Sequence, residues 1–235
     1  MKIAGLHKTT LIDYPGQIAA TVFLSGCNFR CPWCYSSELV LPEKIKNQPI
    51  ISEEEFFGWL KERKGLLDGI VICGGEPTIN NDLPEFIKKI KELGFLVKLD
   101  TNGSNPKMLK KLIDDKLIDY VAMDIKGPAE PNFQFPISNF QEIYGKKIKK
   151  SVEILKEGKV GFEFRTTVVP SVHKKEDFLK IAEWIGGPNV KYYLQNFRAE
   201  KTLDSEYEKL KPYSDEFLQK IQKEISHHFQ TCEIR

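Results

Sequence analysis

The sequence predicts an α/β protein with a mainly parallel sheet. Short runs of apolar, often β-branched residues alternate with longer amphipathic segments about six times along the 235 residues. These runs are apolar on both faces, which is typical of parallel strands that helices cover on each side. Open doubly wound sheets and full or partial (β/α) barrels share this pattern. In each of them the site lies at the carboxyl ends of the strands.

The expected elements follow one another in strict alternation. We expect strands at Ala20–Leu24, Gly69–Cys73, Phe95–Asp100, Ile118–Ile125, Val160–Val169 and Val190–Gln195, with a short final strand at Gln230–Ile234. We expect helices at Ser52–Arg63, Leu83–Leu93, Pro106–Asp114, Lys147–Lys156, Lys175–Ile185 and Ser214–His227. Ser52 and Glu55 have the spacing of a capping box, and Gly94 is placed to end the second helix.

Composition excludes several classes of protein. Hydrophobic residues make up 41% of the chain, which is enough for a core. The 35 basic and 33 acidic residues leave a net charge of +2, so no broad basic field for DNA is present. The apolar runs are too short for a membrane span, and residues 1–10 do not have the apolar stretch of a signal peptide. We therefore expect a cytoplasmic protein without a DNA or membrane partner.

Three of the five cysteines lie within eight consecutive residues. Cys27, Cys31 and Cys34 form a CxxxCxxC pattern directly after the first expected strand, while Cys73 and Cys232 lie far from them in the sequence. An odd number of cysteines does not fit a disulfide framework, whereas thiolates this close in sequence can bind one metal centre. A cubane iron–sulfur cluster usually takes four ligands, so three cysteines would leave one iron open. A zinc knuckle completed by His7 or Cys73, or three unrelated buried thiols, are the alternatives.

The cysteine pattern and a second motif together resemble the radical S-adenosylmethionine (radical SAM) enzymes. The second motif is Gly74-Gly75-Glu76-Pro77, directly after the next expected strand. The resemblance implies a partial (β/α)6 barrel and one [4Fe–4S] cluster bound by Cys27, Cys31 and Cys34. It implies that the open iron chelates S-adenosylmethionine. One electron then cleaves the sulfonium, and the 5′-deoxyadenosyl radical removes a hydrogen atom from the substrate. It also implies a single domain over 1–235, with its core at about 18–197 and a C-terminal helical extension at 198–235.

Other polar residues at expected strand ends gain a role from this resemblance. It implies cofactor contacts by Gly74, Gly75, Glu76, Asn102, Lys126, Arg165 and His173, and a monovalent cation at Asp100 and Asp124. Each has a structural alternative. Asn102 fits a helix-capping turn, Asp124 and Lys126 fit an internal ion pair, Arg165 fits a pair with Glu163 or Glu76, and His173 fits a surface loop. Gln195 and Phe197 are expected to line the substrate opening.

The segment before the first expected strand indicates a subclass. Asp13-Tyr14-Pro15-Gly16, which by itself is a turn sequence, precedes the strand and the cysteines in a manner similar to activating proteins of anaerobic ribonucleoside-triphosphate reductase. That resemblance implies a glycyl radical formed on a partner enzyme, with reduced flavodoxin or ferredoxin as electron donor. Asp13 and Gly16, with the proline-rich segment Gly127–Gly145, would then face the protein substrate.

One departure from the activase pattern leaves a second enzyme class open. Tyr35-Ser36 follows the last cysteine, where activases commonly have His-Asn. The alternative is a radical SAM enzyme that modifies a small molecule or nucleobase, similar to 7-carboxy-7-deazaguanine synthase. Those proteins often have a longer cysteine motif, so the plain spacing here favours the activase.

Overall fold

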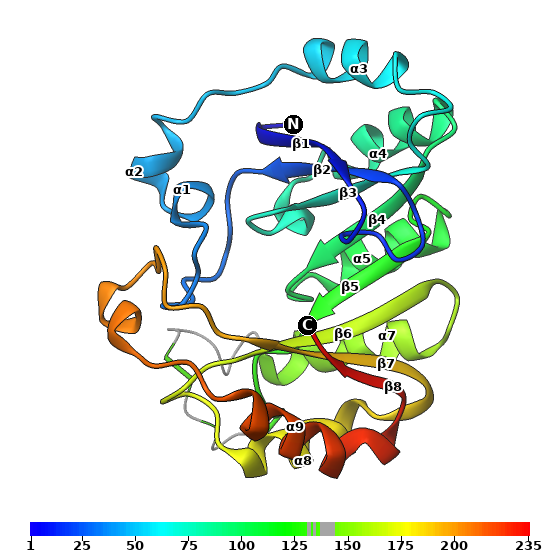
Figure 1. Ribbon diagram of the computed structural model, residues 1–235. Coiled ribbons are helices and arrows are strands. Elements are labelled where there is room, and N and C mark those ends of the chain that lie inside the picture. Colours follow the sequence, from blue (N-terminus) through cyan, green and yellow to red (C-terminus); the bar gives the residue numbers. More distant parts are fainter. Residues whose placement is uncertain (131–132, 134, 137–143) are drawn as a thin grey trace. The chain divides into compact units, whose positions relative to one another are not determined.

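The computed structural model describes residues 1–130, 133, 135–136 and 144–235. The chain forms two compact units. Unit 1 consists of Met1–Phe29, Ser36–Thr101 and Lys107–Val121, and unit 2 consists of Arg30–Tyr35, Asn102–Pro106 and Ala122–Arg235. Figure 1 gives the course of the chain and the labels of its elements. The single domain expected over 1–235 stays a prediction.

Unit 1 contains four strands whose order in the sheet is their order in the chain. They are β1 (Ile3–Thr10), β2 (Ala19–Leu24), β3 (Gly69–Gly74) and β4 (Leu96–Thr101). β2, β3 and β4 are parallel, as predicted, while β1 is antiparallel to β2. The sequence did not predict β1. Its residues lack a regular apolar alternation, and its middle is exposed, so its pairing with β2 decides its conformation.

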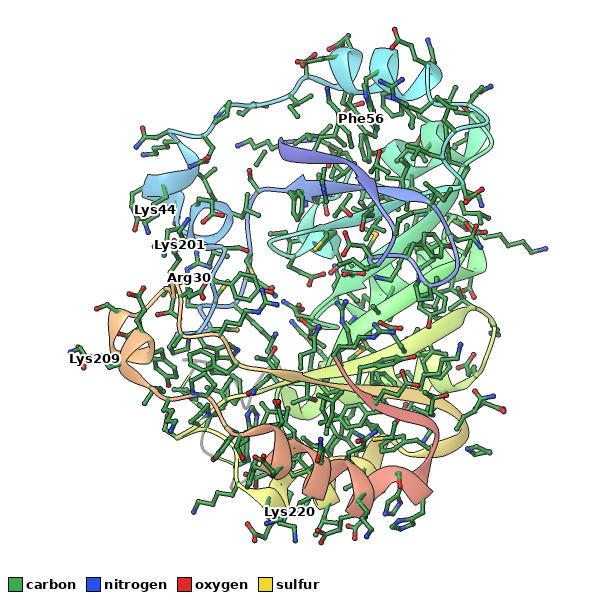
Figure 2. All side chains as sticks on the ribbon, in the orientation of Figure 1. Arg30, Lys44, Phe56, Lys201, Lys209 and Lys220 are labelled. Carbon is green, nitrogen blue, oxygen red and sulfur yellow. The ribbon has the colours of Figure 1, made fainter. Side chains whose placement is uncertain are left out.

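The helices of unit 1 follow the predicted segments closely. They are α3 (Glu53–Lys61), α4 (Leu83–Glu92) and α5 (Pro106–Asp114, whose first residue belongs to unit 2). The short η1 (Pro77–Ile79) was not predicted. Ser52 Oγ accepts a hydrogen bond from Glu55 N at 3.1 Å, so the predicted cap of α3 is confirmed. Phe56 of α3 is fully buried, with its ring 5.4 Å from that of Phe86 of α4 (Figure 2). The four-residue helices α1 (Ser37–Val40) and α2 (Pro42–Ile45) were not predicted, because one turn has no detectable period.

Unit 2 repeats the same alternation. β5 (Tyr120–Asp124) begins in unit 1 and ends in unit 2. β6 (Gly161–Val168), β7 (Gly187–Asn196) and β8 (Phe229–Ile234) are parallel in chain order, so the predicted short final strand is confirmed. The helical elements are η2 (Tyr144–Ile148), α7 (Lys149–Lys156), α8 (Lys175–Ile185), η3 (Ser205–Lys209), α9 (Asp215–Ile225) and η4 (Ser226–His228).

The interiors of strands β2 to β7 are buried on both faces, as the sequence predicted, whereas β1 and β8 are partly exposed. In β2 and β3, consecutive residues that point to opposite faces are equally inaccessible, for example Ile70, Val71 and Ile72 at 0% exposure. The predicted α/β class with a mainly parallel sheet is therefore confirmed. Most of the predicted proline-rich segment at 127–145 lies outside the described residues. Among the helices that are described, none has the length and apolar character needed to cross a membrane.

Candidate active site

The loop after β2 contains the three clustered cysteines. In unit 1, Phe29 N donates a hydrogen bond to Cys27 Sγ at 3.4 Å. In unit 2, Cys34 N donates to Cys31 O at 3.0 Å, so the second and third cysteines lie on one tight turn. All five cysteines are among the described residues, and none of them is in a disulfide. Three thiols on one short loop, one of which accepts a backbone N–H, are a donor set that fits an iron–sulfur cluster.

Backbone packing explains the glycine pair after β3. Gly75 N donates to Leu24 O at 2.9 Å, and Glu76 N donates to Gly26 O at 2.8 Å. A Cβ atom on Gly75 would lie 1.9 Å from Gly26 O, and Gly74 has a φ of +116°. Both positions therefore require glycine. The Gly74–Glu76 turn lies directly against the segment that leads into Cys27.

Glu76 is buried and held from several sides. Its carboxylate is 1% exposed, and Oε1 accepts hydrogen bonds from Thr78 N at 3.1 Å and from Thr101 Oγ1 at 2.7 Å. Thr101 is the last residue of β4, so Glu76 connects the carboxyl ends of β3 and β4. The sequence did not predict the hydrogen bonds of these two threonines with Glu76. Short polar side chains at strand ends are too common to have indicated this role.

A buried ion pair also lies on β4. Lys98 is 1% exposed and pairs with Asp100, a residue predicted as a cation ligand. The sequence analysis missed Lys98, although a lysine inside an otherwise apolar strand is the same signal that pointed to Arg165. Cation binding by Asp100 stays a prediction.

In unit 2, one carboxylate lies between two cationic side chains. Asp124 Oδ2 is 3.4 Å from Lys126 Nζ, and its Oδ1 is 3.3 Å from Arg165 Nε. Burial raises the pKa of Asp124, but the charges of Lys126 and Arg165 outweigh this effect and hold the pKa below its usual value. Two cationic side chains therefore lie beside one carboxylate in unit 2. A small cavity of about 10 Å³, room for roughly one water, is lined by Trp33, Asp124, Ile125, Lys126 and Thr167.

Glu163, one of the two alternative partners expected for Arg165, pairs with a residue near the end of the chain. Glu163 lies two residues earlier on β6 and is fully buried, and its carboxylate pairs with Arg235 at 2.9 Å. The Arg235 guanidinium also lies over the Tyr193 ring, 3.3 Å from its centroid. The sequence did not predict the pairing of Arg165 with Asp124. The ion pair between Glu163 of β6 and Arg235, the residue after β8, is a tertiary contact that the sequence could not reveal.

His173 is buried and not a surface-loop residue. Its Nδ1 accepts a hydrogen bond from Val169 N at 3.0 Å, and its Nε2 lies 2.9 Å from Lys126 O. This pattern assigns the proton to Nε2, which donates to the carbonyl. Burial lowers the pKa of His173 and keeps the ring neutral. With both nitrogens bonded to backbone atoms, His173 positions Lys126.

We expect the neutral state of His173 to make the protein less stable in mild acid. The pKa is lower in the folded state than in the unfolded state, so the unfolded chain binds the extra proton as the pH falls below about 6.5. The free energy of unfolding should then fall by up to about 1.4 kcal/mol per pH unit from this residue. Urea unfolding at about pH 7.5 and about pH 5.5 measures the loss. His173→Gln should reduce the difference, and the exposed His227→Gln should not; equal pH dependence in all three proteins would contradict the prediction.

Two further predicted residues lie in turns. Asn102 is 7% exposed, and its Oδ1 accepts a hydrogen bond from Ser104 N at 2.9 Å, which is the turn before α5 that the sequence allowed. Phe197, predicted to line the substrate opening, is 2% exposed. Tyr35, which stands where activases commonly have histidine, is 62% exposed.

The Asp13–Gly16 segment lies at the amino-terminal ends of the parallel strands of unit 1. Asp13 Oδ2 accepts a hydrogen bond from Thr21 Oγ1 at 2.7 Å, and Tyr14 is 5% exposed and packs beside Gly69, the first residue of β3. Gly74–Glu76 follows the other end of that strand. The structure therefore does not bring Asp13 and Gly16 together with Gly74–Glu76, and substrate binding by them stays a prediction.

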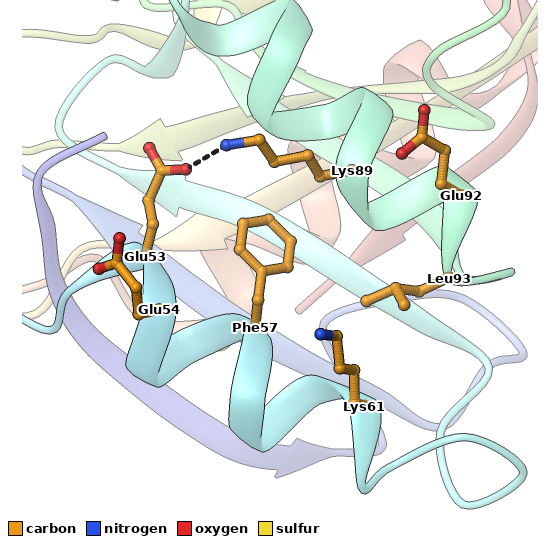
Figure 3. A pocket seen from close by; sticks show the side chains of 7 residues that line it. All are labelled: Glu53, Glu54, Phe57, Lys61, Lys89, Glu92 and Leu93. Atoms are coloured by element: carbon orange, nitrogen blue, oxygen red, sulfur yellow. Dashed lines mark hydrogen bonds and ion pairs between the residues drawn. The ribbon is translucent and has the colours of Figure 1, made fainter.

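A pocket of about 380 Å³ in unit 1 lies between α3 and α4 (Figure 3). The Lys89–Glu53 ion pair, 2.8 Å long, spans it. None of the predicted site residues lines this pocket, and its lining combines both charges with two apolar side chains: Glu53, Glu54, Phe57, Lys61, Lys89, Glu92 and Leu93.

Comparison with known families identifies the class of protein. The model of the radical SAM superfamily matches residues 21–185, which include the cysteine loop and the residues at the ends of β3 to β6. The chain belongs to this superfamily. Its members are defined by a [4Fe–4S] cluster and S-adenosylmethionine, which the cysteine loop fits.

The chain is similar to two relatives that carry different names. A Methanocaldococcus jannaschii protein named "Putative glycyl-radical enzyme activating enzyme" is 34% identical over 99% of this chain and 95% of its own length. The 7-carboxy-7-deazaguanine synthase of Aquifex aeolicus is 28% identical over 68% of this chain and 84% of its own length.

Solved structures show the same fold. Streptococcus suis SuiB bound to its precursor peptide SuiA matches with a TM-score of 0.69 at 13% identity, over 92% of this chain and 48% of that one. The anSMEcpe structure with bound AdoMet matches with a TM-score of 0.54 at 23% identity, over 73% of this chain and 48% of that one. The chain spans about half the length of these two structures. The radical SAM fold predicted from the motifs is thus confirmed.

Proposed function

We propose that this protein is a glycyl-radical enzyme activating enzyme whose cluster is bound by Cys27, Cys31 and Cys34. The observation that carries the proposal is the CxxxCxxC loop at the end of β2, with no disulfide and with a backbone N–H donated to Cys27 Sγ. The near full-length relative with the activating-enzyme name supports the subclass.

S-adenosylmethionine would bind to the residues at the strand ends. The proposed set is Gly74, Gly75, Glu76, Asn102, Lys126, Arg165 and His173. The cationic groups of Lys126 and Arg165 lie next to each other at Asp124, and such groups can pair with the cofactor carboxylate. His173 holds the Lys126 carbonyl, and Gly75 keeps the turn against Gly26.

When bound, the cluster and S-adenosylmethionine would supply the chemistry, which is hydrogen-atom abstraction from a glycine of the partner after one-electron reduction by flavodoxin or ferredoxin. The chain's own residues hold the cluster and the cofactor and exclude water. Anaerobic ribonucleoside-triphosphate reductase is the proposed partner, on the strength of the Asp13-Tyr14-Pro15-Gly16 segment before β2.

Electron paramagnetic resonance tests this function directly. The reconstituted, reduced protein is mixed with S-adenosylmethionine and an anaerobic ribonucleotide reductase, and a glycyl-radical doublet is expected on the reductase. Replacing the radical-bearing glycine of the reductase by alanine is the control that should abolish the doublet. Cofactor cleavage without any doublet would reject this partner.

A smaller set of observations favours a second function, that of a 7-carboxy-7-deazaguanine synthase. The Aquifex aeolicus relative supports it, as does Tyr35 in place of the usual histidine. Formation of 7-carboxy-7-deazaguanine by the reconstituted protein would establish this alternative, and its absence together with a glycyl radical would exclude it.

A further inference from the structure

Residues Thr202–Tyr207 form a structured segment of unit 2, here named the 202–207 strap. Thr202 is 7% exposed, and its Oγ1 donates a hydrogen bond to Asp204 O at 2.6 Å. Asp204 Oδ1 accepts from Glu206 N at 3.0 Å and so begins η3, which ends at the exposed Lys209 (Figure 2). The segment is thus held by its own hydrogen bonds, although it falls in the region that the sequence analysis treated as an extension.

The 202–207 strap contacts the cysteine loop directly. Asp204 N donates a hydrogen bond to Pro32 O at 2.9 Å. The ring of Tyr207 lies 6.1 Å from that of Trp33, which is 6% exposed. Pro32 and Trp33 are the two residues between Cys31 and Cys34. One backbone hydrogen bond and one aromatic contact therefore act on the turn that carries two of the three proposed cluster ligands.

Trp33 is held on other sides by residues of the same unit. Its ring lies 6.4 Å from that of His173 and 5.1 Å from that of Phe135. Tyr213 Oη donates to His173 O at 2.9 Å, which links the segment after the strap to the same histidine. Burial raises the pKa of Tyr207, and its hydroxyl forms a hydrogen bond with Ser171. Trp33 thus packs between Tyr207 of the 202–207 strap and His173, whose ring bonds to the Lys126 carbonyl.

We infer that the 202–207 strap is a positioning element for the cluster: it fixes Pro32 and Trp33, so that Cys31 and Cys34 keep their ligating positions and oxygen is kept from the cluster. This inference rests on the proposed cluster at Cys27, Cys31 and Cys34. Groups that orient metal ligands without binding the metal affect metal retention strongly, and Tyr207 meets that description through Trp33.

The test is the lifetime of the cluster in air. The anaerobically reconstituted holoprotein is exposed to air, and the loss of its visible absorbance is followed with time. Tyr207→Ala is expected to bleach about 10-fold faster than wild type, whereas Tyr207→Phe, which keeps the ring, should restore most of the lifetime. Glu208→Ala, an exposed position in the same helix, is the matched control and should match wild type. For each protein, the iron content is measured before the exposure to air. The electron paramagnetic resonance spectrum of the reduced cluster is also recorded.

The outcomes separate this inference from the proposed function. A Tyr207→Ala protein that holds as much iron as wild type and bleaches at the wild-type rate overturns the inference that the 202–207 strap positions the cluster. Should Tyr207→Ala fail to fold by circular dichroism, Thr202→Val takes its place, because it removes only the hydroxyl that holds Asp204 O. If Thr202→Val bleaches at the wild-type rate, the same inference is overturned. A wild-type protein that binds no iron at all rejects the proposed function, and the inference with it.

Discussion

Replacing Cys31 by alanine is expected to remove nearly all bound iron and to lower S-adenosylmethionine cleavage by more than about 100-fold, since even outer-shell changes cost about 10–100-fold. The physical reason is that the proposed cluster has three cysteine ligands on one short loop. A cluster held by only two of them would lose its iron to solvent. Iron and sulfide analysis, the visible spectrum and the yield of 5′-deoxyadenosine measure the effect. Cys27→Ala and Cys34→Ala should behave alike.

Cys232→Ala is the matched control for this prediction. Cys232 lies on β8, and burial, with a smaller contribution from Glu233, raises its pKa to about 12, so its sulfur stays a protonated thiol rather than a ligating thiolate. Its removal should leave the iron content unchanged. Equal iron loss in Cys232→Ala and Cys31→Ala, or full 5′-deoxyadenosine production by Cys31→Ala, would contradict the assignment of the ligands.

Replacing Gly75 by alanine is expected to destabilise the protein by about 3 kcal/mol even without any cofactor, the upper part of the range for overpacked sites. The new Cβ would lie 1.9 Å from Gly26 O, a backbone atom that cannot rotate away. Relief of this clash would also break the hydrogen bond from Glu76 N to the same carbonyl. Urea unfolding of the apoprotein at neutral pH measures the loss, because no cofactor contact contributes there.

Gly58→Ala is the control for the effect of replacing a glycine by alanine where no steric clash arises. Gly58 lies in α3, and its Cβ position has no atom within 4 Å. Alanine there should raise the stability by about 0.5–1 kcal/mol, because glycine weakens helix interiors. An unchanged free energy of unfolding in Gly75→Ala would show that the turn can move away from Gly26, and would leave the cofactor as the sole reason for glycine.

The sequence was most informative where a local rule governs the outcome. The buried strands β2 to β7, the helices between them and the cap at Ser52 follow from hydrophobic period and capping chemistry, which short segments carry by themselves. No local rule predicts β1, α1 and α2, and the sequence did not reveal them. The first depends on pairing with β2, and the other two are single turns.

For the candidate site, the sequence alone predicted the cysteine ligands, the glycine turn and the charged strand ends, because spacing and strand polarity are properties of the chain. Only the tertiary structure decided what each of these side chains contacts. Arg165 pairs with Asp124 and Glu163 pairs with Arg235 near the chain end, and His173 is neutral because burial lowers its pKa. The 202–207 strap likewise meets Pro32 and Trp33 across some 170 intervening residues. Contacts at such separation depend on the packing of whole elements, which no local pattern encodes.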